Sequence, residues 1–283
     1  MTFSVAIAPT QIGIGGPVFG LKLNQLLLAF CALLSIVASG ARAESIVDVR
    51  YGDPVERYGH FALGRPHEYS RLTVRSDSGR EASFSLPESE VFEDLSPRIV
   101  TLAAGEAKQI LTIVSRRDSG ARLVLFRLSA GRLDIAAQSP AIGTPMRWLN
   151  PVGVADLDGD GQAEIAAVIT PHIGGTLKIY RRDGKDLVEI AALGGFSNHV
   201  YGSVELALSA PAVIAGKTHL LAPDATRRLL RVVRLEKGRL VDVSHCPLTA
   251  PITGPIKVLS STEVSVQLLS GPQVVVLNKC LKS

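Results

Sequence analysis

The stretch from Asp156 to Glu164 is the part of the chain best suited to chemistry, because an oxygen-bearing residue stands at every second position. A hard cation such as Ca²⁺ takes roughly 6–8 oxygen ligands in flexible geometry. Gly159 and Gly161 can adopt the positive φ angles that a tight loop requires. The pattern therefore predicts a Ca²⁺ site formed by the carboxylates of Asp156, Asp158, Asp160 and Glu164 and by the backbone carbonyl of Gln162.

The flanks of this loop exclude an EF-hand. An EF-hand requires a glutamate at the twelfth position and a helix on each side, but the twelfth residue here is Ala167. Short apolar runs with β-branched residues, 151–155 and 165–170, indicate buried strands instead. We expect a strand–loop–strand hairpin, and the alternative is an Asp/Gly turn that binds no metal.

The segment from Gly153 to Ile165 resembles the FG-GAP/VCBS repeat of integrin-alpha-type β-propellers. In that family the loop joins the first two strands of a blade and holds a structural Ca²⁺. The resemblance covers about one blade, since no run of carboxylates appears near Gly105 or Gly216. It implies a single cation site with a structural role.

The N-terminal 43 residues are typical of an export signal. Leu23–Val37 is mostly apolar, Lys22 precedes it, and Ala41–Ala43 supplies a small-x-small cleavage pattern. The run is shorter than the ~20 apolar residues of a membrane span, although an uncleaved signal-anchor is an alternative. We expect a signal peptide over 1–43, one domain over 44–283, a periplasmic or secreted location and no stable membrane span.

Charge and cysteines narrow the possible partners. Residues 1–43 contain two basic residues and no acid, so the formal net charge of +4 falls to +2 without them. That near balance argues against nucleic acid, which requires a clustered basic surface. Cys246 and Cys280 would remain, and an even count in an exported protein predicts a disulfide. Two free buried thiols are the alternative.

The rest of the chain has the pattern of an all-β protein. Short apolar segments alternate with turns rich in Gly, Asp, Ser and Pro. Strands are expected in pairs around these turns, at 109–115 and 122–128, 132–137, 176–180 and 187–192, and 229–235 and 240–243.

The expected strands also repeat. Candidate first strands begin near Arg98, Val152, Val204 and Ile256, at spacings of 54, 52 and 52 residues. Such periods predict a β-propeller of about five four-stranded blades. Ser45–Arg50 would complete the last blade, closing the ring with N- and C-terminal strands. Six blades or a β-sandwich assembly are the alternatives.

Blade geometry would place three loops at the end opposite the Asp156–Glu164 loop. These loops hold a candidate ligand patch of one stacking ring, one cation and several neutral hydrogen-bonding groups: Arg147, Trp148, His172, Asn198, His199 and Tyr201. A sugar, a peptide or a small anion would suit this set. The same side chains could instead pack between blades or cap turns. A Zn²⁺ site on His172 and His199 would need further ligands.

Catalytic motifs are missing from the sequence: it contains no G-x-S-x-G, Walker or H-E-x-x-H pattern. We expect the early acids, including Glu88, Glu93 and Asp94, to be solvated, and His60 and His67 to be structural. The sequence thus predicts an exported, monomeric, non-enzymatic module for a protein or carbohydrate ligand. The alternative is a propeller enzyme, a hydrolase or lyase acting on carbohydrate, with its site opposite the Ca²⁺ loop.

Overall fold

The structure is a computed structural model that describes residues 1, 2, 4, 11, 13 and 44–282. Nearly all of the expected signal segment, including its apolar run and cleavage site, lies outside the described residues. Residues 44–282 belong to one compact unit. Within the described part of the chain, no helix is long and apolar enough to cross a membrane.

The unit is all-β, and its described elements are strands and two short 3-10 helices. The strands that build the first part are β1 (Ile46–Val55), β2 (Glu68–Ser76), β3 (Glu81–Ser85), β4 (Glu90–Phe92), β5 (Arg98–Val100), β6 (Gln109–Arg116), β7 (Gly120–Ser129) and β8 (Arg132–Gln138). The middle strands are β9 (Leu149–Ala155), β10 (Glu164–Ile169), β11 (Gly175–Asp183) and β12 (Asp186–Phe196). The last are β13 (Ala210–Ile214), β14 (Lys217–Pro223), β15 (Leu229–Glu236), β16 (Arg239–Pro247), β17 (Ile252–Val258), β18 (Glu263–Leu268), β19 (Gly271–Val276) and β20 (Leu281–Lys282). The 3-10 helices are η1 (Phe61–Leu63) and η2 (Leu277–Lys279).

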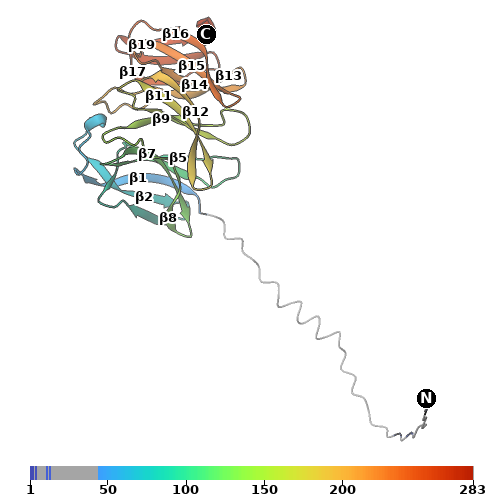
Figure 1. Ribbon diagram of the computed structural model, residues 1–283. Helices are drawn as coiled ribbons and strands as arrows, with labels where there is room; N and C mark the ends of the chain where they lie inside the picture. The colour runs from blue at the N-terminus through green and yellow to red at the C-terminus, as the bar shows by residue number, and fades with distance from the viewer. Residues whose placement is uncertain (3, 5–10, 12, 14–43, 283) are drawn as a thin grey trace. The chain divides into compact units, whose positions relative to one another are not determined.

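The strands form three sheets of antiparallel meanders. The largest has twelve strands in the order β1-β2-β4-β6-β7-β8-β12-β11-β10-β9, with β3 on β2 and β5 on β6. A single parallel bridge, Gln138 to Asp186, joins its two halves. The second sheet has the order β13-β14-β15-β16-β20, and the third β17-β18-β19. Figure 1 shows β1, β2 and β8 at one end of the unit, β9, β11 and β12 in the middle, and the strands of the second and third sheets together at the other end.

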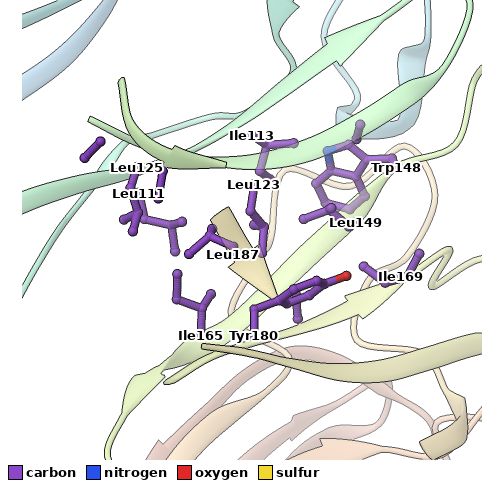
Figure 2. Close-up of a cluster of buried hydrophobic side chains, with 14 of the residues drawn as sticks. Leu111, Ile113, Leu123, Leu125, Trp148, Leu149, Ile165, Ile169, Tyr180 and Leu187 are labelled. Atoms are coloured by element: carbon purple, nitrogen blue, oxygen red, sulfur yellow. The ribbon is translucent and has the colours of Figure 1, made fainter. Parts of the chain in front are cut away.

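Burial explains why these segments are strands. In β6, seven of the eight residues are buried, as expected for a strand covered on both faces. β3 shows the alternating pattern of a strand with one exposed face. The main core cluster joins β6 and β7 to β9, β10 and β11, and Leu111, Leu123, Ile165 and Tyr180 belong to it (Figure 2). This packing fixes the β9–β10 hairpin against the preceding meander.

The expected strands of the middle and C-terminal parts are confirmed. Each predicted segment from 109–115 to 240–243 overlaps one of the strands from β6 to β16. The prediction of a strand starting near Val204 is wrong, because β13 begins at Ala210. Ser203 and Glu205 accept hydrogen bonds from backbone N–H groups two residues further on, which holds this segment in turns.

The expected pairing of the two terminal strands is also wrong. Ser45–Arg50 falls in β1, which pairs along its whole length with β2, and β20 pairs with β16. Ile46 enters the core cluster that contains Leu72 and Val74, so local burial decides the partner of β1. None of the pairings between described strands closes a ring, and β1 lies at the opposite end of the unit from β17 and β19 in Figure 1.

Cys246 and Cys280 lie at disulfide distance, with their Cα atoms 4.6 Å apart. The cross-link connects the end of β16 to the residue before β20, and His245 pairs with Leu281 beside it. A loop of 34 residues corresponds to about 3–4 kcal/mol in the loop-entropy model. The cross-link therefore holds the C-terminal strand on β16 and away from β1.

Candidate functional site

The acidic loop connects β9 to β10, as the sequence predicted. The two strands are antiparallel, and Glu164 pairs with Ala155 at the base of the loop. Gly159 and Gly161 have φ angles of 85° and 88°, which glycine adopts without the steric cost of a Cβ. The loop therefore folds back on itself and turns its carboxylates inward.

Three carboxylates converge at the centre of this loop. Ligand atoms of Asp156, Asp158 and Glu164 all lie within 4.8 Å of one another, and Glu164 is fully buried. Asp156 accepts hydrogen bonds from the backbone N–H groups of Gly159 and Gly161. These oxygens retain lone pairs for a cation, so the donor set suits a hard metal ion.

The other two expected ligands were Asp160 and the backbone carbonyl of Gln162, and of these Asp160 lies outside this group. Asp160 accepts a hydrogen bond from the backbone N–H of Gln162 at 2.8 Å. Gln162 forms an isolated β-bridge with Ala103, and the N–H of Ala163 donates to the carbonyl of Leu102. The backbone of the loop is thus tied to the segment between β5 and β6.

Arg181 on β11 brings a positive charge to the loop. Its Nη2 atom lies 2.6 Å from a carboxylate oxygen of Asp158 and 2.6 Å from one of Glu164. Asp160 is 3.7 Å away. Four acidic side chains in the loop against one arginine leave an excess of negative charge that a divalent cation could reduce.

The expected patch lies at the other end of the hairpin, where four aromatic rings meet. The rings of Trp148 and His172 are stacked at 6.0 Å with an interplanar angle of 6°. His199 approaches Trp148 edge-on at 4.9 Å, and Tyr201 approaches His172 at 5.2 Å. Trp148 and His199 are buried, whereas Tyr201 is 57 % exposed. The topology therefore brings these four predicted residues together.

Asn198 and Arg147, the other two residues of the expected patch, form hydrogen bonds. Asn198 is fully buried, and its amide donates to the carbonyl of Asn150 and to the hydroxyl of Ser209. The Asn150 amide donates in return to the carbonyl of Asn198. Arg147 donates to the neighbouring carbonyl of Met146. These contacts are structural: Asn150 and Asn198 join β9 to the segment after β12.

His172 and His199 form a hydrogen-bonded pair. Nε2 of His172 lies 2.8 Å from Nδ1 of His199, and Nε2 of His199 lies 3.0 Å from the carbonyl of Ser203. Burial lowers the pKa of each histidine to about 4. Within the described residues, no third histidine, cysteine or acid joins them in a group with metal-ligand spacing. Two neutral imidazoles that share a proton fit this geometry better than a Zn²⁺ site.

A second polar cluster beneath the rings was not predicted. Nδ1 of His60 lies 2.6 Å from Oε1 of Glu93, and the hydroxyl of Ser115 donates to Oε2 of the same carboxyl. The indole N–H of Trp148 donates to the backbone carbonyl of Glu93 at 2.9 Å. The His60 ring lies 6.1 Å from that of Tyr201. Glu93 thus connects the new cluster to the predicted one.

Two close backbone contacts hold His60 in place. The N–H of Gly202 donates to the carbonyl of Ala62 in η1. A Cβ on Gly64 would lie 2.2 Å from the carbonyl oxygen of Gly202, so only glycine fits there. The segment around η1 is therefore packed directly on the loop that carries Tyr201.

The expectation that the early acids are solvated is wrong for Glu93 and Asp94. Both are almost fully buried. Glu93 is enclosed by His60, Ser115 and Trp148. Asp94 forms a bidentate ion pair with Arg98. Burial raises the pKa of Glu93, and it also raises the pKa of the neighbouring Glu68. Glu88 is exposed, as expected.

Comparison with known proteins assigns no family. No protein-family model matches the chain, and no curated protein matches it.

The histidine pair predicts a loss of stability in acid. Unfolded histidine titrates near 6.5, and the folded pKa of both residues is about 4. Between these values the unfolded chain binds more protons, so the free energy of unfolding falls as pH falls from about 6.5 to about 4. His199, which is fully buried, should contribute roughly 3 kcal/mol of this loss.

Urea unfolding of the purified protein at a series of pH values measures this effect. His172→Gln should flatten the profile between pH 4 and 6.5, whereas the matched variant His67→Gln, outside the pair, should retain it. Equal slopes in all three proteins would contradict the assignment of neutral buried imidazoles.

Proposed function

We propose that this protein is an exported, non-enzymatic binding module whose ligand surface is the rim formed by His60, His172 and Tyr201. The observation that carries the proposal is the exposed Tyr201 ring, held edge-on against His172 above a buried polar cluster. Three apolar side chains that neighbour this set in the sequence are also exposed: Phe61, Ile173 and Val204. An aromatic ring beside neutral hydrogen-bonding groups suits a carbohydrate ligand, which offers apolar faces and hydroxyls.

Export is part of this proposal. It rests on the apolar run and small-residue pattern before Ala43 and on the pairing of Cys246 with Cys280. Disulfides persist in oxidising compartments and are rare in the cytosol. We propose a periplasmic or secreted monomer.

The blade interpretation also belongs to the proposal. The meanders β5–β8, β9–β12 and β13–β16 each have four strands, and β17–β19 has three, which agrees with the repeat spacing in the sequence. We propose that these meanders are blades of the FG-GAP/VCBS type, arranged without the expected pairing of the terminal strands. The supporting observation is the position of the acidic loop between the first two strands of its meander.

We further propose that Asp156, Asp158 and Glu164 bind Ca²⁺ and that the ion is structural. The three carboxylates repel one another, and Arg181 offsets only part of their charge. A cation at their centre would relieve that repulsion and stabilise the β9–β10 hairpin. In this proposal the ion stabilises the hairpin and takes no part in ligand binding or catalysis.

The structural role of Ca²⁺ predicts a saturable rise in melting temperature when chelated protein is titrated with Ca²⁺, because a ligand of the folded state stabilises it by linkage. Asp158→Ala should abolish the rise. Asp183→Ala, which removes an exposed carboxylate from the β11–β12 turn, should leave it intact. If the melting temperatures of the unmodified protein and of Asp183→Ala do not change with Ca²⁺, and elemental analysis finds no calcium, the loop is an Asp/Gly turn that binds no metal.

The rim predicts binding to carbohydrates through Tyr201. On a glycan array, the purified protein should retain a subset of glycans, and Tyr201→Ala should weaken that binding by roughly tenfold, since an exposed aromatic ring contributes about 1 kcal/mol or more. Val213→Ala changes an exposed apolar residue on β13 and serves as the control. If the protein retains peptides on a peptide array but no glycans, the ligand is a peptide and not a carbohydrate. If Tyr201→Ala binds as tightly as the unmodified protein, the rim is not the binding site.

A second candidate function, a hydrolase or lyase that acts on carbohydrate, is favoured by the pairing of His60 with Glu93. A carboxylate on Nδ1 orients an imidazole and leaves Nε2 for proton transfer. If retained glycans are cleaved, mass spectrometry will detect the products. His60→Gln should then lower the rate at least 100-fold, while His67→Gln keeps it. Intact glycans after prolonged incubation would leave the binding function alone.

A further inference from the structure

A cavity of about 740 Å³ lies on the N-terminal part of the sheet, away from the acidic loop. It is formed where the segment after β1 crosses the ends of β4 and β6. It is lined by residues from three segments: Arg57 and Tyr58 after β1, Glu88, Ser89 and Val91 at β4, and Arg116, Arg117 and Asp118 at the β6–β7 turn. Its volume falls within the range of small-molecule sites, ~300–1,000 Å³.

Arg57 brings a partly buried positive charge to this cavity without a counter-ion. Its Nη2 donates to the carbonyls of Pro87 and Glu90, at 3.0 and 2.6 Å. Its Nε is buried and has no hydrogen-bond partner. Among the described residues, no carboxylate lies at ion-pair distance from this guanidinium. A buried charge without a partner is costly, so the site favours an anion.

Arg117 adds a second uncompensated charge. It donates a hydrogen bond to the backbone carbonyl of Arg57, and within the described chain it too has no carboxylate at ion-pair distance. The other basic groups nearby are neutralised locally. Arg116 forms a bidentate ion pair with Asp118, and Nη2 of Arg122 lies 2.9 Å from Oε1 of Glu90. The cavity therefore presents two guanidinium groups that donate to backbone carbonyls but have no carboxylate at ion-pair distance within the described chain.

The remaining wall favours an apolar body attached to the anion. Tyr58 is buried, with 4 % of its surface exposed. Val91 beside it is also buried. Glu88 is exposed at the edge and forms no ion pair within the described residues. A ligand must direct its charge toward the arginines and away from Glu88.

From these observations we propose that the cavity binds a small organic anion, with its carboxylate between Arg57 and Arg117 and an apolar, ring-sized body against Tyr58 and Val91. The planar forks of two arginines match a carboxylate through paired charge-assisted hydrogen bonds. This proposal is independent of the acidic loop and of the Tyr201 rim, since it shares no residue with either.

Isothermal titration of the purified protein with benzoate tests the proposal. Benzamide, a neutral molecule of nearly the same shape, should bind at least tenfold more weakly. Inorganic phosphate, an anion without an apolar body, should also bind more weakly than benzoate.

Three variants locate the site. Arg117→Gln should weaken benzoate binding by roughly tenfold or more, as expected for loss of a charge-assisted contact. Glu88→Gln should strengthen it by removing a like charge. Arg132→Gln, which changes an exposed arginine on β8, is the control and should bind as the unmodified protein does.

The proposal fails if benzoate produces no binding heat, if benzamide binds equally well, or if Arg117→Gln leaves the affinity unchanged. Tighter binding of phosphate than of benzoate would contradict the part of the proposal that places an apolar body against Tyr58 and Val91. Far-UV circular dichroism of each variant verifies its fold. Arg57→Lys keeps the positive charge but loses the planar guanidinium, and it should also weaken benzoate binding.

Discussion

The buried carboxyl group of Glu93 is the point on which the arrangement of this molecule depends. A carboxyl removed from water must find hydrogen-bond partners inside the protein. Glu93 finds them in His60 and Ser115, while its backbone carbonyl receives the indole N–H of Trp148. These three residues precede η1, lie in β6 and precede β9, respectively. One residue thereby fixes the N-terminal segment, the first meander and the start of the second.

The two ends of the β9–β10 hairpin show opposite solutions to the burial of polar groups. At one end, Asp156, Asp158 and Glu164 gather negative charge that Arg181 offsets in part. At the other, the half-buried His172 and the buried His199 form a neutral, hydrogen-bonded pair. The charged end is expected to respond to ions and the neutral end to acid.

Local pattern was enough to predict much of this structure from the sequence. Alternation and turn residues located β6 to β12, β15 and β16, but not β13 and β14. The acidic loop was found because its carboxylates lie within nine consecutive residues. The meeting of the four aromatic rings was predicted too, because blade geometry places the segments that carry Trp148, His172, His199 and Tyr201 at one end. The pairing of His60 with Glu93 was missed because 33 residues separate them and no local pattern marks Glu93 as buried. The partner of β1 was likewise decided by a core, around Ile46 and Leu72, that sequence spacing does not reveal.

Arg181 has a consequence for where the protein can work. A free ion reaches the loop only at the concentration its surroundings provide, but a guanidinium attached to β11 is always present at the same effective concentration. The carboxylates of Asp158 and Glu164 therefore keep a positive neighbour in fluids from which divalent ions have been removed. The hairpin therefore keeps part of its charge compensation even when no divalent ion is bound.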